Sequence, residues 1–85
     1  NLAVDYSRYG VTVNAIQPGF IATERFEAAA PPKLIESFKN ATSVKRIGTP
    51  QEVADLILFL ASDRASYITG AVVPIGGGAG LNNLW

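Results

Sequence analysis

The stretch that decides the fold is residues 11–19, VTVNAIQPG. Its first six residues are β-branched or apolar, apart from one asparagine, and they show no alternation of polar and apolar side chains. Such a run favours a strand that is covered on both faces, as strands are in a parallel sheet. Pro18 and Gly19 then end the strand. We therefore predict a buried strand that is followed at once by a turn.

A helix and a second strand are predicted further along the chain. Thr49-Pro50-Gln51-Glu52 is a capping box with proline at the first helical position, and it predicts a helix from Thr49 to Ser62. Residues 71–75, AVVPI, predict a strand at a sheet edge or ending there, because Pro74 has no N–H to donate. Two apolar strands joined by a helical crossover predict a right-handed βαβ unit of an α/β fold.

The remaining segments have weaker patterns. Residues 1–9 carry apolar side chains at helical spacing, and Gly10 stands where a helix C-cap glycine belongs, so a helix is expected there. Residues 20–44 are the least regular part of the chain, and we expect a mobile loop-and-helix flap. A helix within this flap should begin at Pro31-Pro32.

The composition excludes several classes of function. Seven Lys and Arg balance seven Asp and Glu, so the net charge is zero and offers no electrostatic basis for binding nucleic acid or an anionic membrane. The longest apolar run, residues 56–61, is too short to span a bilayer. Without Cys or His, the chain has no disulfide, no thiolate or histidine metal site, and no Ser–His–Asp triad.

The size of the chain points to a piece of a larger fold. A folded chain of 85 residues buries only about 60% of its unfolded surface, and a parallel sheet needs more strands than this chain supplies. The sequence also contains no Met, with which an intact translation product begins. We expect the interior or C-terminal part of a longer polypeptide.

The candidate ligand site is residues 17–23, QPGFIAT, directly after the first strand. In open α/β sheets, ligands bind in the crevice outside the carboxyl ends of the strands. Free backbone groups and the Thr23 hydroxyl could hydrogen-bond an amide or a phosphate there. The alternative is an ordinary turn that ends the strand, in which Pro18 and Gly19 only provide the backbone conformation of the turn. Spacing by itself favours this alternative.

Three other features are interpreted as structural. Residues 76–80 are rich in glycine like a phosphate-binding loop. They have no glycine at the third glycine position of the dinucleotide motif G-x-G-x-x-G, and no helix is predicted after them. They therefore predict a plain turn before an apolar end, residues 81–85. The phenols Tyr6, Tyr9 and Tyr67 have no cation four residues later, so none is predicted to act as a base. The ionic side chains around Glu24, Glu27 and Lys45-Arg46 are interpreted as solvated surface.

Several of these segments together resemble the short-chain dehydrogenase/reductase family. They are LAVDY (residues 2–6), GVTVNAIQPGFIAT (10–23), RIGTPQEVA (46–54), LASD (60–63) and YITG (67–70). The resemblance covers nearly the whole chain except the flap and the last residues, and the 3-oxoacyl-carrier-protein reductase and sugar or polyol dehydrogenase branches are most similar. A βαβ piece of another Rossmann-like enzyme, such as a methyltransferase, would fit the fold but not these motifs.

The resemblance implies a Rossmann-type doubly wound parallel sheet that binds NAD or NADP, with residues 1–85 as the C-terminal part of a single dinucleotide-binding domain. It implies hydride transfer between nicotinamide and a small-molecule alcohol or ketone. Pro18 and Gly19 would shape the turn beneath the nicotinamide, and the Ile21 backbone would hold its carboxamide. Thr23 would bond the carboxamide or the pyrophosphate.

Further roles are implied by the same resemblance. Asn14 would fix the strand. The flap would cover the substrate and carries the aromatic residues Phe20, Phe26 and Phe38. The protein would assemble as a homo-oligomer through the region of Leu58, Phe59 and Val73.

The catalytic residues of the family would lie upstream of Asn1, so the chain alone is predicted to be catalytically incompetent. Gly76 stands where the family usually carries Asp, a departure confined to the terminal turn. The alternative is a truncated, non-catalytic product that persists as an oligomerisation module. A cytoplasmic location is expected because Cys and a signal segment are absent.

Overall fold

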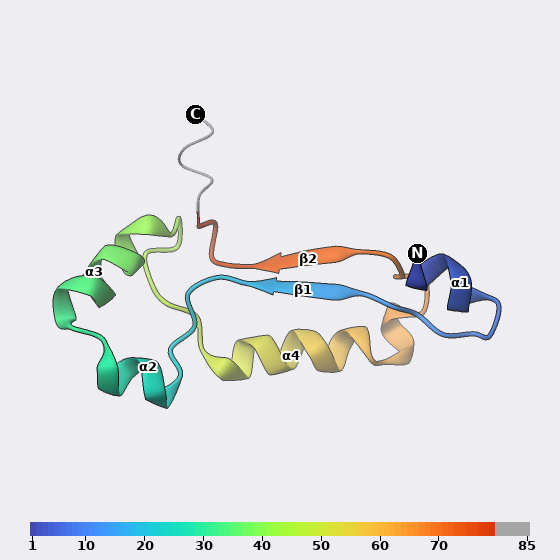
Figure 1. The fold of residues 1–85 in the computed structure, drawn as a ribbon, viewed down its shortest axis with the longest axis horizontal. Helices are drawn as coiled ribbons and strands as arrows, with labels where there is room; N and C mark the ends of the chain where they lie inside the picture. Colours follow the sequence, from blue (N-terminus) through green and yellow to red (C-terminus); the bar gives the residue numbers. More distant parts are fainter. Residues whose placement is uncertain (80–85) are drawn as a thin grey trace.

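The computed structural model describes residues 1–79, and it forms an elongated α/β unit (Figure 1). Its elements are α1 (Leu2–Ser7), β1 (Ala15–Pro18), α2 (Glu24–Ala29), α3 (Pro32–Ala41), α4 (Pro50–Leu60), the 3₁₀ helix η1 (Asp63–Ala65) and β2 (Val72–Ile75). The radius of gyration is 15.8 Å, whereas a compact domain of this length would have about 12 Å. The chain is therefore extended along its strands. Residues 80–85, including the predicted apolar end, lie outside the described part.

The sheet consists of two parallel strands, as the sequence predicts. β1 pairs with β2 in a register that runs from Ala15 opposite Val72 to Pro18 opposite Ile75. Two connecting segments lie between them: the flap, with helices α2 and α3, and then helix α4. Both arrows in Figure 1 point toward the flap, so the carboxyl ends of the strands meet there, and α1 lies at their amino ends.

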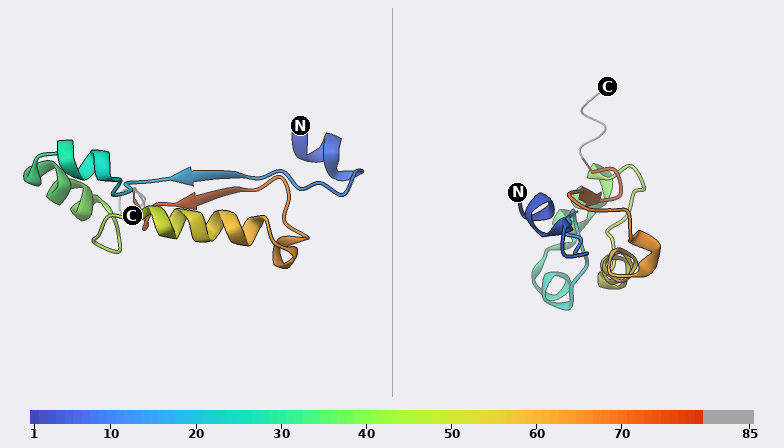
Figure 2. Two further views of the ribbon diagram at one scale, coloured as in Figure 1. Left: turned by 90° about the horizontal axis from the view of Figure 1, so that it is seen from below. Right: turned by 90° about the vertical axis from the view of Figure 1, so that its right-hand side faces the viewer.

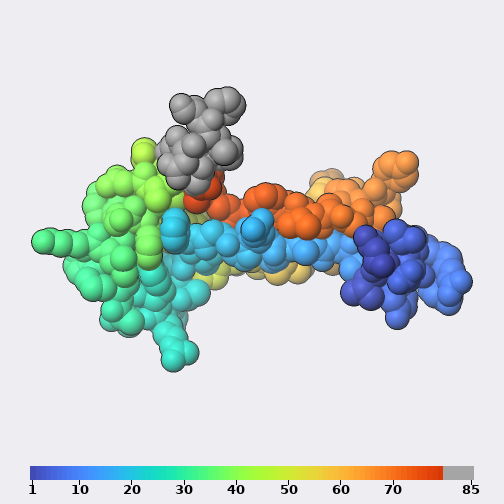
Figure 3. All heavy atoms as spheres, turned by 45° about the horizontal axis from the view of Figure 1, so that its top comes forward, coloured from blue at the N-terminus to red at the C-terminus, as the bar shows by residue number. Residues whose placement is uncertain are grey.

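Helix α4 covers one face of the strand pair (Figures 1 and 2). The strand side chains on that face, Ile16, Val73 and Ile75, are half-buried. The side chains of the other face are exposed, as Figure 3 shows for the strands, and Val72 keeps 65% of its surface accessible. The prediction of strands covered on both faces is therefore wrong for residues 1–79, because no described helix lies over the second face.

The strands are shorter than the sequence predicts. The ladder runs from the Ala15 N–H, which donates to Ala71 O at 2.9 Å, to the Gly19 N–H, which donates to Ile75 O at 3.0 Å. Strand β1 therefore begins at Ala15 rather than Val11, and it ends at Pro18, as expected. Because successive peptide groups point to opposite sides, Pro74 places its missing N–H on the outer edge of β2.

The helix boundaries follow local capping signals. In α4 the Thr49 hydroxyl accepts from the Glu52 N–H at 3.2 Å, and the Glu52 carboxylate accepts from the Thr49 N–H at 3.0 Å, which is the predicted capping box. Helix α1 is capped by the Asn1 side chain, which accepts from the Ala3 N–H at 2.9 Å. The helix ends at Ser7 with Arg8 as its C-cap, two residues earlier than predicted, and Gly10, with φ of +74°, lies in the turn that follows.

The core of the described chain is small. Only Ala3, Thr42 and Ala65 are buried among residues 1–79, at 6%, 1% and 1% exposure. None of the helices in this part of the chain is long and apolar enough to cross a membrane. An apolar composition with so little burial is what a piece of a larger sheet presents.

Candidate functional site

The carboxyl ends of β1 and β2 border an open groove of about 760 Å³. Residues 17–19 line one side of it, and residues 74–79 line the other. The groove lies beside the flap, at the end of the sheet toward which both strands run (Figure 1). This is the location where open parallel sheets bind their ligands.

Gly19 and Gly76 are in close backbone contact at the head of this groove. A Cβ atom on Gly19 would lie 2.8 Å from the Gly76 Cα, closer than Cβ atoms approach other heavy atoms. The Gly19 N–H also donates to Ile75 O, so the two strand ends cannot move apart without losing that bond. Glycine at position 19 is therefore required by close approach, and the loop surface there is bare backbone.

The Ile21 N–H is an unpaired donor next to this contact. A short parallel bridge holds the loop to Gly48, whose N–H donates to Phe20 O at 2.9 Å and whose carbonyl accepts from the Ala22 N–H at 2.8 Å. The Ile21 peptide N–H points away from Gly48, because alternate peptide groups face opposite sides. Within residues 1–79 this N–H has no hydrogen-bond acceptor, whereas the Ile21 carbonyl accepts from the Thr23 N–H at 3.0 Å.

Thr23 is a helix cap. Its hydroxyl oxygen accepts from the Phe26 N–H at 3.1 Å and begins α2. The cap uses a lone pair of the oxygen and leaves the O–H hydrogen able to donate. The sequence pattern predicts Thr23 as a ligand contact and does not predict α2. The signal was present, because an N-cap threonine is followed by Glu24 and Glu27 in the first helical turn.

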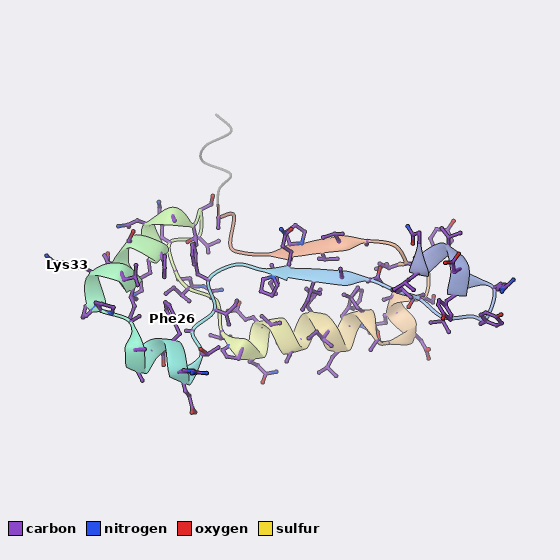
Figure 4. The ribbon with its side chains drawn as sticks, in the orientation of Figure 1. Phe26 and Lys33 are labelled. Carbon is purple, nitrogen blue, oxygen red and sulfur yellow. The ribbon has the colours of Figure 1, made fainter. Side chains whose placement is uncertain are left out.

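The three flap aromatics gather into one cluster. The rings of Phe20 and Phe38 stack with centroids 4.3 Å apart, and those of Phe26 and Phe38 lie 5.7 Å apart. Figure 4 shows Phe26 on the inner side of the flap, whereas Lys33 points away from the molecule. The structure brings together the residues that were predicted to form the flap, and they pack against one another. Their contact with a substrate stays a prediction.

An ion pair fastens the segment that leads into α4. Arg46 donates two hydrogen bonds to the Glu52 carboxylate, at 2.7 and 2.8 Å. The hydrogen bond from Arg46, together with that from the Thr49 N–H, lowers the pKa of Glu52 to about 2. Glu52 in turn raises the pKa of Arg46. The sequence analysis interpreted Arg46 as a solvated residue and missed this pair, because the two residues are six positions apart across a loop.

The predicted interface residues differ in exposure. Leu58 and Phe59 are 66% and 43% exposed on α4. Val73 is half-buried on the strand face that α4 covers. Leu58 and Phe59 thus remain available to a partner, whereas Val73 belongs to the packing between β2 and α4. Assembly through this region stays a prediction.

Asn14 has the structural role that was predicted for it. Its side-chain amide donates to Ile68 O at 3.0 Å, and its Oδ1 accepts from the Ala71 N–H at 3.0 Å. The phenols lie at this same amino end of the strands, with Tyr6 in α1 and Tyr67 just before Ile68. The groove is at the opposite end, so no phenol of residues 1–79 reaches it (Figure 1).

In the described part of the chain, no three Asp, Glu, Cys or His side chains are grouped so that they could hold a metal ion. The groove itself is lined by backbone, proline and small side chains rather than by carboxylates. The lining is largely apolar, which suits a flat, uncharged group better than a cation.

Comparison with known proteins gives consistent similarities. A family model described as enoyl-(acyl carrier protein) reductase matches residues 1–80. The chain is 49% identical over 80 residues to protein FixR of Bradyrhizobium diazoefficiens, covering 94% of this chain and 27% of that protein. It is 44% identical to galactitol 2-dehydrogenase (L-tagatose-forming) of Cereibacter sphaeroides, covering 91% of this chain and 31% of that enzyme.

A solved structure is similar over the same span. The chain superposes on a 3-oxoacyl-[acyl-carrier protein] reductase of Brucella melitensis with a TM-score of 0.87 and 38% identity, covering 92% of this chain and 29% of that one. The chain therefore spans about a third of the length of the proteins it matches. These similarities also place its two parallel strands in a Rossmann-type sheet.

Proposed function

The chain belongs to the short-chain dehydrogenase/reductase family, and from this premise we propose that it forms the nicotinamide-binding end of an NAD(P)-dependent oxidoreductase. The reaction is hydride transfer between the nicotinamide and a small alcohol or ketone. The observation that carries the proposal is the Ile21 N–H, an unpaired donor of residues 1–79 at the carboxyl ends of the strands. Membership of the family confirms the resemblance that the motifs predict.

The residues that line the groove, together with Ile21 and Thr23 in the loop after β1, fit a nicotinamide. Its carboxamide needs a donor for its carbonyl oxygen, and the Ile21 N–H and the Thr23 hydroxyl are both able to donate. Pro18 and Gly19 offer a flat surface of ring and bare backbone, against which a planar ring can lie. The dinucleotide, when bound, accepts or supplies the hydride. Ile21 and Thr23 orient its amide, and Gly19 leaves room for its approach.

Proton transfer requires groups from elsewhere. An alcohol must lose its proton as the hydride leaves, and a positioned base must accept it. Within residues 1–79 no histidine, cysteine or phenol lies at the groove. The chain alone is therefore proposed to show no turnover, and steady reduction of a ketone by a verified 9.0 kDa species would disprove this part.

The test of the site compares Ile21→Pro with Ile21→Ala in the native protein. Proline removes the N–H, whereas alanine keeps it and loses only the side chain. We expect Ile21→Pro to raise the Kd for NADH or NADPH about tenfold, the effect of one good hydrogen bond, with Ile21→Ala within about twofold of wild type. Calorimetric titration measures both.

ADP-ribose supplies the control ligand, because it lacks the nicotinamide. Its affinity should be the same in both variants, which separates a lost carboxamide contact from a damaged fold. Equal NADH and NADPH affinities for Ile21→Pro and Ile21→Ala would contradict the proposed role of Ile21.

The second candidate function is an oligomerisation module without catalysis. It is favoured by the exposed apolar side chains Leu58 and Phe59 on α4 and by the uncovered second face of the strands. It predicts a folded multimer that binds neither NADH nor NADPH. Sedimentation equilibrium combined with a dinucleotide titration distinguishes the two candidates. A cytoplasmic location remains part of the proposal.

A further inference from the structure

The turn that follows β2 is docked onto the segment that follows α3. This glycine turn, residues 76–79, is closed by the Ala79 N–H, which donates to Gly76 O at 3.0 Å. The Gly77 carbonyl accepts from both the Ser43 N–H and the Val44 N–H, at 2.9 and 3.1 Å. A turn that the sequence predicts to be plain is thus bonded to a segment more than thirty residues away, and Ser43 Oγ also donates to Gly78 O.

Two positions of the glycine turn admit only glycine. Gly77 and Gly78 have φ of +60° and +78°, in the left-handed region. A Cβ on Gly77 would lie 2.7 Å from the Val44 Cγ2, and a Cβ on Gly78 would lie 2.7 Å from the Ser43 Cβ. Gly76 differs, because its Cβ would meet its nearest atom, the Gly19 Cα, at 3.6 Å, an ordinary contact.

The docked segment is continuous with α3 and is hydrogen-bonded to its last turn. Thr42 is 1% exposed, and its hydroxyl lies 3.0 Å from Lys39 O and 3.2 Å from Arg46 O. The same hydroxyl accepts from the Arg46 N–H at 3.2 Å. A buried side chain with these bonds ties the last turn of α3 to the loop, so whatever holds Ser43 and Val44 also holds α3.

The flap has few other attachments. Helices α2 and α3 bury no side chain completely. The entry to the flap is held by the Gly48 bridge at Phe20 and Ala22. The phenylalanine cluster holds the flap together internally. The glycine turn is therefore one of two anchors at the exit of the flap, and the other is the Arg46–Glu52 ion pair, to which Thr42 is bonded through Arg46.

We propose that the glycine turn is a latch that sets the resting position of the flap over the carboxyl ends of the strands, with Gly77 and Gly78 as positioning residues. The latch acts through the Gly77 carbonyl, which holds residues 43–44, and through Thr42, which passes that constraint to α3. The statement that the flap covers a substrate rests on the proposed function. The statement that the glycine turn holds the flap is independent of the proposed function.

The test measures amide hydrogen exchange in the native protein carrying Gly77→Ala. The added methyl group displaces Val44, so the amides of Ser43, Val44 and α3 should exchange at least about tenfold faster, and α4 should exchange as in wild type. Gly10→Ala is the matched control for backbone conformation, because Gly10 has φ of +74° and nothing within 4 Å of its Cβ. Gly76→Ala is the control within the turn.

A second substitution keeps the test decisive if Gly77→Ala unfolds the whole protein. Val44→Ala together with Gly77→Ala removes the clashing Cγ2 and should return the exchange of residues 43–44 to within about threefold of Gly10→Ala. The latch proposal would be overturned if the amides of residues 42–44 exchanged no faster in Gly77→Ala than in Gly10→Ala. A double variant that exchanges as fast as Gly77→Ala would also overturn it.

Dinucleotide titration separates the latch from the proposed function. Compared with the double variant that carries Val44→Ala and Gly77→Ala, Gly77→Ala alone should have a KM about fivefold higher for a ketone that the native protein reduces, because both variants add the same methyl group at the groove and only the single variant displaces Val44. A wild-type protein without dinucleotide affinity would refute the proposed function and leave the exchange test intact. Faster exchange with an unchanged KM would overturn the role of the latch in covering the substrate.

Discussion

The two ends of the strand pair are held by different means. At the amino ends, side chains add to the backbone bonds: Asn14 spans Ile68 and Ala71, and the Thr69 hydroxyl accepts from the Val13 N–H at 3.0 Å. At the carboxyl ends, backbone groups and glycines make them, as in the contact of Gly19 with Gly76. At the amino ends, these polar side chains are hydrogen-bonded to nearby backbone groups. At the carboxyl ends, Gly19 and Gly76 are packed so closely that there is no room for a side chain on Gly19.

This difference separates stability from ligand binding. At the amino ends the Asn14 side chain and the Thr69 hydroxyl are already hydrogen-bonded to backbone groups of the chain. At the carboxyl ends the Ile21 N–H stays unpaired within residues 1–79, beside a bare backbone surface. Substitutions at the two ends should therefore act differently on the free energy of unfolding and on dinucleotide affinity.

The largest effect is expected for Gly19→Ala, which breaks the carboxyl end. Its methyl group would lie 2.8 Å from the backbone of Gly76, and backbone cannot rotate aside. We expect a loss of about 3 kcal/mol in the free energy of unfolding, together with loss of NADH and NADPH binding. Urea unfolding and calorimetric titration measure the two quantities.

Gly48→Ala is the matched control for that variant. Its Cβ would lie 3.1 Å from the Ile21 Cδ1, the end of a side chain that can turn away. The cost should stay below about 1 kcal/mol. If the two variants unfolded at the same urea concentration, the close approach of Gly19 and Gly76 would not be a constraint on the fold.

The next effect is expected for Asn14→Ala, which breaks the amino end. It removes the bonds to Ile68 O and from the Ala71 N–H, so the protein should lose about 2 kcal/mol of stability. Dinucleotide affinity at the far end of the strands should change by less than about twofold, once the folded fraction is considered. Exposed Asn40 in α3 supplies the control, since Asn40→Ala should leave stability nearly unchanged. Weakened NADH or NADPH binding in folded Asn14→Ala would show that the two ends are coupled.

The smallest effect is a pH dependence of the segment behind the groove. Glu52 has a folded pKa of about 2 against an ordinary value of 4.5, because Arg46 and the Thr49 N–H favour its carboxylate. The stabilisation is therefore fully present above pH 4.5 and is lost as the pH falls toward 2. Urea unfolding of wild type and Glu52→Gln across this range should show the difference between them shrinking as the pH falls. A constant difference would contradict the depressed pKa.

Local signals were sufficient for much of the fold. The capping box at Thr49 predicts α4 because its partners are three residues apart. The prolines predict the start of α3, and Gly10 predicts the turn that follows the first helix, although that helix already ends at Ser7. The strand pair follows from two apolar runs, and its carboxyl-end loop follows from Pro18. In each case the interaction that decides the structure lies within a few residues of the signal.

The remainder depends on contacts that are distant in sequence. Strand β1 was predicted too long because Val13 bonds to Thr69 rather than to the ladder. Docking of the glycine turn depends on Ser43 and Val44, which no short motif pairs with Gly77. The unpaired Ile21 N–H results from the bridge to Gly48. At the candidate site, the sequence predicts the loop that matters, and the long-range contacts determine which of its atoms remain available.

The pairing of β1 with β2 also sets the order in which the chain can fold. The bond from the Ala71 N–H to Asn14 joins residues 57 positions apart. Closing a loop of that length costs about 4 kcal/mol of chain entropy before any strand contact forms. Helix α4, with its cap three residues from its partner, needs no such closure. The helix is therefore expected to form early, and joining of the strands is expected to limit the folding rate, as in other chains dominated by distant contacts.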